Sequence, residues 1–273
     1  MSGGVTELDE VLDLAEHALE HGDPHGAMTL CAQVLLDHPD HIGALFLTAE
    51  AHRDLRELDQ AERRYRRVIH FDSNHSPSWS GLGVVLFDQL RFEESRRAVN
   101  RAIRLLPENS EALYLRGMLR ERRQDYDGSE RDFRRAYRAD PGGFPRPVFL
   151  SDAMVESVVE DALRSMHPSI RQYLSQVSIL LEEVPDEETC RQWDPPMPPG
   201  EILGYFSGPS LLDRSVEDPW SNLPSAIVLY RRNLSRIAWD TKRLVEELRV
   251  TVFHEVGHFL GLDEEDLERR GLD

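Results

Sequence analysis

The first half of the chain repeats every 34 residues, and this period constrains the fold more than any other feature. Four periods cover about residues 8–141. Pro39, Pro107 and Pro141 fall on the same grid, and Ser73 occupies the remaining slot. A period of this length fits one pair of helices, which buries its apolar stripe only by stacking on the next pair. The sequence therefore predicts an α-helical solenoid.

Small residues mark two positions of the period, as expected where two helices cross closely. They are Ala27, Ala61, Ser95 and Ser129, and then Ala15, Ala49, Gly83 and Gly117. Larger side chains that would fill the gap between helices recur at Cys31, Tyr65, Val99 and Phe133. With Trp79-x-x-Leu82-Gly83, this pattern resembles the tetratricopeptide repeat (TPR).

The resemblance implies a curved stack with a concave groove. That groove would carry Leu12, Phe46, Ser80, Tyr114, Glu16, Glu50, Val84 and Met118. It would bind a peptide or protein partner, or dock the protein's own second half, and the sequence leaves both open. Arginines also recur on the grid, at positions 63, 97 and 131 and at 67, 101 and 135. They form either a basic ladder for an acidic partner or a solvated face paired with neighbouring acids.

Charge and hydropathy exclude two classes of partner. The net charge of −18 disfavours binding to nucleic acid, which is itself a polyanion. No apolar run approaches the roughly 18 residues of a membrane span. The N-terminus has no secretion-signal pattern, and Cys31 and Cys190 form no disulfide or metal motif. We expect a cytoplasmic protein.

A run of proline and glycine between Pro141 and Pro147 ends the repeats. We expect an array at 1–141, a linker at 142–148 and a second domain at 149–273. The sequence pattern of the second domain predicts a small α+β fold. Its predicted elements are a helix at 151–166 capped by Asp152, buried strands at 177–181 and 226–230, a loop at 194–200, a short strand at 202–206 and a long helix from Asp240 to Leu260.

The long helix carries the pattern His254-Glu255-x-x-His258. Two histidines four residues apart point the same way from a helix and supply two corners of a zinc site. Glu255 lies beside them, where it would hold the metal-bound water and accept its proton. The apolar side chains at 245, 248, 252, 256, 259 and 260 fall on the opposite side of this helix.

Gly261 allows a sharp turn that returns an acidic run toward the metal. A carboxylate is an acceptable third zinc ligand. We favour Glu264 as this ligand and Asp263 as the N-cap of a last helix from Glu264 to Arg270, but the sequence also allows Asp263 as the ligand.

These segments resemble the bacterial minimal-zincin metallopeptidases. The resemblance covers about residues 149–273 and rests on LGYFSG at 203–208, LPSAIVLYR at 223–231 and TVFHEVGHFLGLDEEDL at 251–267, closing on Gly271. It implies zinc at His254 and His258 with Glu255 as general base, and it favours an acidic third ligand at Glu264.

The functional prediction is a zinc metallopeptidase acting on a peptide or protein substrate. The strand ending at Tyr230 would align the substrate backbone. Tyr205 or Tyr230 would stabilise the oxyanion or simply pack in the core. His167 is interpreted as a helix-end residue. Two alternatives remain. One is a non-catalytic TPR scaffold with a structural or inactive zincin-like domain, and the other is a latent peptidase covered by its repeats.

Overall fold

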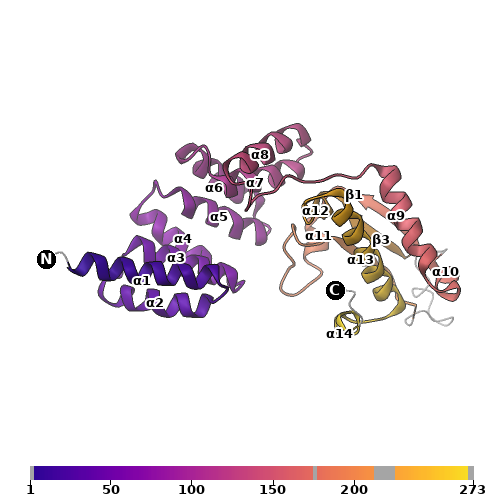
Figure 1. The fold of residues 1–273 in the computed structure, drawn as a ribbon, viewed down its shortest axis with the longest axis horizontal. Coiled ribbons are helices and arrows are strands. Elements are labelled where there is room, and N and C mark those ends of the chain that lie inside the picture. Colours follow the sequence, from indigo (N-terminus) through magenta and orange to yellow (C-terminus); the bar gives the residue numbers. More distant parts are fainter. Residues whose placement is uncertain (1–2, 175–176, 212–224, 270–273) are drawn as a thin grey trace. The chain divides into compact units, whose positions relative to one another are not determined.

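The computed structural model describes residues 3–174, 177–211 and 225–269 (Figure 1). The chain divides into two compact units, Met1–Phe144 and Pro145–Asp273. The first unit is α-helical, and the second combines helices with a small sheet.

Eight helices of the first unit follow one another in four pairs. They are α1 (Gly3–Glu20), α2 (Pro24–Asp37), α3 (Ile42–Asp54), α4 (Leu58–Phe71), α5 (Ser76–Asp88), α6 (Phe92–Leu105), α7 (Ser110–Glu121) and α8 (Tyr126–Ala139). Each helix packs against the next along the chain, and α1, α3, α5 and α7 also contact one another in order. The predicted helical solenoid is confirmed.

The small residues of the repeat lie where its helices cross. A Cβ atom added to Gly83 would come within 2.7 Å of Val99 Cγ2, and one added to Gly117 would come within 2.6 Å of Phe133 Cε1. Val99 is fully buried, and Phe133 nearly so. The pairing of a small slot with a gap-filling side chain is therefore confirmed in the last two repeats.

The second series of repeated arginines has a structural role that neither interpretation anticipated. Arg67, Arg101 and Arg135 each donate a hydrogen bond to a backbone carbonyl 28 residues earlier in the chain. The acceptors belong to Pro39, Ser73 and Pro107. Each of these arginines thus ties one repeat to the loop that closes the previous one. The first series, at 63, 97 and 131, is exposed.

A charged network crosses the face that was predicted to form the groove. Arg53 binds Glu50 at 2.6 Å on its own helix and Glu111 at 2.8 Å on α7. Tyr65 donates a hydrogen bond to Glu50, and Ser80 of α5 donates one to Glu111. The network therefore joins α3, α4, α5 and α7.

The second unit contains three strands and six helices among its described residues. They are α9 (Asp152–Ser165), α10 (Pro168–Leu174), β1 (Ser178–Glu182), α11 (Glu187–Cys190), β2 (Gly204–Ser207), β3 (Ala226–Tyr230), α12 (Arg231–Leu234), α13 (Thr241–Leu260) and α14 (Glu264–Glu268). The strand order is β1-β3-β2, with β1 parallel and β2 antiparallel to β3. The core joins β3, α9 and α13.

Two expectations about the strands were wrong. The strand predicted as buried at 177–181 is β1, an edge strand whose side chains alternate in exposure, with Leu180 46% exposed. The strand ending at Tyr230 is β3, which lies between β1 and β2. Both edges of β3 are already hydrogen-bonded, so it has no edge to offer a substrate backbone.

The predicted helix at 151–166 is present as α9, but its N-cap is Ser151 rather than Asp152. The Ser151 hydroxyl accepts a hydrogen bond from the Met154 amide at 3.3 Å. Asp152 is the first residue inside the helix, where its charge favours the helix N-terminus. Residues 223 and 224 of the quoted resemblance, the predicted helix end at Arg270, and Gly271 lie outside the described residues.

Candidate metal centre

Helix α13 begins and buries its core face as the sequence predicts. Asp240 caps the helix by accepting a hydrogen bond from the Arg243 amide at 2.8 Å. Leu248, Val252 and Phe259 are almost completely buried. These side chains fix the rotation of the helix, because turning it would expose the stripe.

A left-handed turn follows the second histidine. Gly261 has φ of +88°, a conformation that favours glycine. The Leu262 amide donates to the Gly257 carbonyl at 3.0 Å, which closes the last turn of α13. Asp263 then caps α14 by accepting from the Asp266 amide at 2.9 Å. The predicted turn and the predicted Asp263 cap are both confirmed.

Close packing between α13 and α14 sets the position of Glu264. A Cβ atom added to Gly257 would come within 2.3 Å of Leu267 Cδ2, and Leu267 is fully buried. Gly257 therefore lets α14 approach α13 closely. As a result Glu264, the first residue of α14, reaches the two histidines.

Three potential ligand atoms meet at this point. His254 Nε2 and His258 Nε2 lie 3.1 Å apart. Glu264 Oε2 is 3.7 Å from His254 Nε2, and Glu264 Oε1 is 3.4 Å from His258 Nε2. With metal–ligand bonds of about 2.0–2.1 Å, ligand atoms of a tetrahedral zinc site stand about 3.4 Å apart. The residues therefore fit a zinc ion in spacing and in donor type.

A backbone contact orients the second histidine. His258 Nδ1 lies 3.2 Å from the Leu262 carbonyl oxygen, which can only accept a hydrogen bond. A neutral His258 ring would therefore carry its proton on Nδ1, which leaves Nε2 on the side of His254 and Glu264. A ring held in this way by its other nitrogen is typical of metal-ligating histidines.

Glu255 is enclosed beside this group. Its side chain is 5% exposed. Burial raises the pKa of Glu255 to about 8, the backbone hydrogen bond with Phe206 opposes this shift, and the charge of Glu264 adds to it. Gly204 of β2 makes the space, because a Cβ atom there would lie 3.0 Å from Glu255 Oε1 and from Thr251 Cγ2. The arrangement keeps the carboxyl group of Glu255 away from bulk water.

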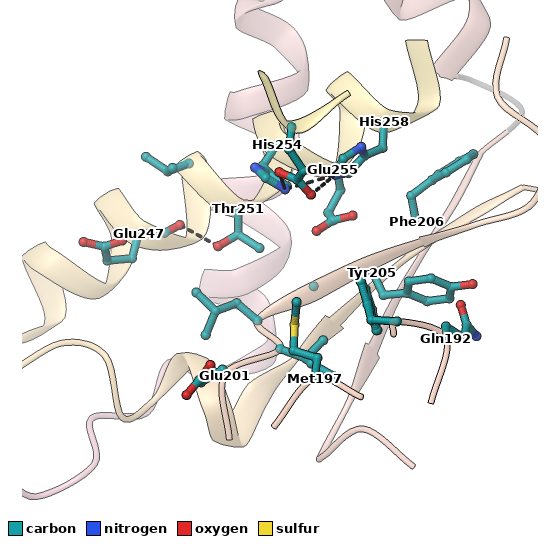
Figure 2. Close-up of a pocket in the computed structure, with 16 residues that line it drawn as sticks. Gln192, Met197, Glu201, Tyr205, Phe206, Glu247, Thr251, His254, Glu255 and His258 are labelled. Carbon is teal, nitrogen blue, oxygen red and sulfur yellow. Dashed lines mark hydrogen bonds and ion pairs between the residues drawn. The ribbon is translucent and has the colours of Figure 1, made fainter. Parts of the chain in front are cut away.

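The ligand group and Glu255 line a cleft of about 790 Å³. Figure 2 shows α13 on one side of this cleft and, facing it, β2 with the segment that precedes it. Sequence reasoning missed most of the lining. Glu247 and Thr251 stand seven and three residues before His254, so helical spacing alone would have found them. Trp193, Met197 and Glu201 come from a loop and carry no such signal.

The two tyrosines considered for the oxyanion are in different places. Tyr205 lines the cleft, and its ring packs against that of Trp193 with centroids 5.9 Å apart. Tyr230 is 2% exposed and is not part of the lining, and burial raises its pKa to about 12. Tyr230 is therefore a core residue. His167 lies between α9 and α10, as its interpretation as a helix-end residue predicts.

A second group of potential ligands lies at the C-terminal end of α1. The group consists of His17, Glu20 and His21. One potential ligand atom of each lies within 4.8 Å of the other two, and all three side chains are exposed. None of the three is among the residues that line the cleft. Among the residues that the structure describes, no helix is long and apolar enough to cross a membrane.

Family models match both parts of the chain. A model described as zincin-like metallopeptidase matches residues 174–272. Two models described as tetratricopeptide repeat match residues 18–82 and 81–144. Both resemblances inferred from the sequence are thereby confirmed.

Similarity to a curated relative covers a minor part of both chains. Protein O-mannosyl-transferase Tmtc3 of Drosophila melanogaster is 28% identical over 85 residues, which are 31% of this chain and 9% of that protein. The match thus spans under a tenth of that relative's length.

Solved structures of similar proteins include TTC0263, a thermophilic TPR protein of Thermus thermophilus. It is 17% identical with a TM-score of 0.45, covering 62% of this chain and 87% of that one. MamA from Desulfovibrio magneticus RS-1 is 13% identical with a TM-score of 0.42, covering 62% and 89%. The chain contains tetratricopeptide repeats within residues 18–144, followed by a zincin-like metallopeptidase domain within residues 174–272.

Proposed function

We propose that this protein is a zinc-dependent peptidase that hydrolyses peptide bonds. His254, His258 and Glu264 would hold the zinc ion, and Glu255 would act as general base. The observation that carries the proposal is the spacing of the three ligand atoms, between 3.1 and 3.7 Å. A catalytic zinc site keeps one position open for water or substrate. In agreement, no fourth His, Cys, Asp or Glu joins this group among the described residues.

The proposed roles follow from the chemistry of the donors. Zinc held here would polarise the scissile carbonyl and lower the pKa of a water molecule. Glu255 would accept the proton of that water and pass it to the leaving amine. Its enclosure between α13 and β2 supports this role, because a buried carboxylate holds a fixed position and is poorly solvated.

Substrate alignment is assigned to β2 in place of β3. Gly204, Tyr205 and Phe206 of this strand line the cleft. Within the described residues, β2 pairs only with β3, so its other edge is available to an extended peptide. A substrate pairing with β2 would lie in the same cleft as Glu255 and the ligand group.

A peptidase assay with two variants tests the proposal. Glu255→Gln should lower kcat by about 10²–10⁴-fold because the general base is lost, while zinc remains bound. Glu246→Gln provides the matched control, since Glu246 is exposed on the same helix and lies outside the cleft lining. Full activity in Glu255→Gln would refute the mechanism. A zinc-loaded wild type that cleaves no peptide would favour the non-catalytic TPR scaffold.

For the repeats we infer a role in recruiting a protein partner or substrate, with the array at 1–141 joined through a linker at 142–148 to the peptidase domain at 149–273. The groove binds either a separate protein or the second domain. Removing residues 1–141 distinguishes these cases. Unchanged cleavage of a short peptide would exclude autoinhibition, whereas a clear increase would identify the repeats as a cover for the cleft.

A further inference from the structure

The last turn of α1, which is indigo in Figure 1, brings two imidazole rings together. His17 and His21 are four residues apart, and their ring centroids lie 4.0 Å apart. The His21 amide donates a hydrogen bond to the His17 carbonyl at 3.2 Å, so the helical spacing continues to His21. The pair thus resembles His254 and His258 on α13, whose ring centroids lie 4.7 Å apart.

Glu20 adds a carboxylate to this pair. Its Oε2 atom lies 3.9 Å from His17 Nδ1, and one potential ligand atom of each of the three residues lies within 4.8 Å of the other two. Ligand atoms of a tetrahedral zinc site stand about 3.4 Å apart, so a small rotation of these exposed side chains would bring the group onto one ion. Two imidazoles and a carboxylate suit a transition-metal ion such as Zn²⁺.

A backbone contact orients the second imidazole. His21 Nδ1 lies 2.8 Å from the His17 carbonyl oxygen, which can only accept a hydrogen bond. A neutral His21 ring would therefore carry its proton on Nδ1 and keep the lone pair of Nε2 for a ligand. His258 has the equivalent contact with the Leu262 carbonyl. A ring held through its other nitrogen is typical of metal-ligating histidines.

The electrostatic surroundings of the group favour a cation. All 32 lysines and arginines of the chain lie beyond residue 52, whereas α1 alone carries six acidic side chains. Among the described residues, Glu20 forms its ion pair with His17 and with no lysine or arginine. The group also lies at the C-terminal end of α1, where the helix dipole favours positive charge. A metal ion would therefore displace no fixed cation from Glu20.

The geometry points to a second metal site, in which His17, Glu20 and His21 bind one divalent transition-metal ion such as Zn²⁺, with water completing its coordination. An exposed helix end needs only polar side chains to be soluble, whereas this one places two imidazoles and a carboxylate in register on a single turn. The site belongs to the repeats and does not depend on the proposed peptidase function.

This site binds zinc more weakly than the group on α13. The side chain of His17 is 65% exposed, against 23% for His254, so fixing the ligands around an ion costs more conformational entropy. We expect a zinc affinity at least about tenfold lower than that of the α13 group. Prolonged dialysis against metal-free buffer should therefore empty this site first.

Isothermal titration calorimetry with ZnCl₂ tests the second site. The zinc-loaded protein, dialysed beforehand, should take up one further ion per chain. His17→Ala and His21→Ala should each weaken this uptake at least about tenfold, and Glu20→Gln should weaken it less. Alanine favours the helix, so α1 should persist in these variants, as far-ultraviolet circular dichroism would verify. His38→Ala is the matched control, because His38 is an exposed histidine at the end of α2.

Two further titrations identify the ligands and separate the two sites. MgCl₂ should not compete for the further ion, because Mg²⁺ prefers oxygen ligands. His258→Ala should lose the tightly held ion and keep the weaker one. The second site would be overturned if no further zinc bound at millimolar ZnCl₂, if the double variant His17→Ala/His21→Ala bound it as the wild type does, or if Mg²⁺ displaced it.

Discussion

At the scale of single residues, the position of the Glu255 side chain depends on the lack of a side chain at Gly204. Gly204 lets β2 approach α13, and the nearest atoms to an added Cβ belong to Glu255 and Thr251. The carboxylate can therefore lie against the strand without being displaced. Glycine is needed at this position because β2 and α13 approach closely. An unusual backbone angle is not the reason, because the φ of Gly204 is not positive.

Gly204→Ala should consequently impair catalysis more than metal binding. The added methyl group, 3.0 Å from Glu255 Oε1, would displace the carboxylate from its present position. We expect kcat/KM to fall about ten- to a hundredfold, as displacements of this size can produce. Zinc content and the thermal midpoint of unfolding should change little. Ser207→Ala at the other end of β2 is the control. Loss of zinc in Gly204→Ala would contradict this explanation.

At the scale of elements, the pair formed by α13 and α14 builds the ligand group. The two histidines follow from helical spacing alone, but Glu264 joins them only because the chain turns at Gly261 and α14 packs on Gly257. A local pattern is therefore enough for two ligands, whereas the third depends on contact between two helices.

Gly257→Ala tests this dependence without touching a ligand. The new Cβ atom would overlap Leu267 at 2.3 Å, so this buried side chain must move, and we expect α14 to shift with it and carry Glu264 along. We expect zinc affinity to fall about ten- to a hundredfold in a competition titration with a chelator. In Gly257→Ala/Leu267→Ala the overlap is removed, and part of the affinity should return. An unchanged affinity in the single variant would show that α14 does not position Glu264.

The network centred on Arg53 is a second element-scale feature. Burial raises the pKa of Glu50, and Arg53 opposes this rise. Arg53→Met leaves Glu50 and Glu111 without their shared cation. We expect the free energy of unfolding in urea to fall by about 1–3 kcal/mol at pH 7, with Arg63→Met as the exposed control.

The pH dependence of that loss has a definite sign. A carboxyl whose folded pKa exceeds its unfolded value stabilises the fold at low pH and loses this contribution as pH rises through the folded pKa. Without Arg53, the pKa of Glu50 should rise further. The deficit of Arg53→Met should therefore shrink as pH is lowered from 7 toward 5. A deficit that grows instead would contradict this assignment.

At the scale of the whole molecule, the sequence was sufficient to predict the repeats and the long helix, because local patterns encode both. The repeats were visible because the crossings at Gly83 and Gly117 recur at a fixed period, and α13 was visible through its apolar stripe. The strand order could not be predicted, because strand pairing joins segments that are distant in the sequence. β1 therefore seemed buried and β3 seemed to have a free edge, and the loop residues Trp193 and Met197 in the cleft were not anticipated.

Elemental analysis of the purified protein would test whether the metal centre exists. We expect about one zinc ion per chain in the wild type, its loss in His258→Ala and weaker retention in Glu264→Ala. His17→Ala, which alters the exposed group on α1, should keep the metal. Absence of metal after zinc is supplied, or zinc lost through His17→Ala and kept in His258→Ala, would contradict the proposed centre.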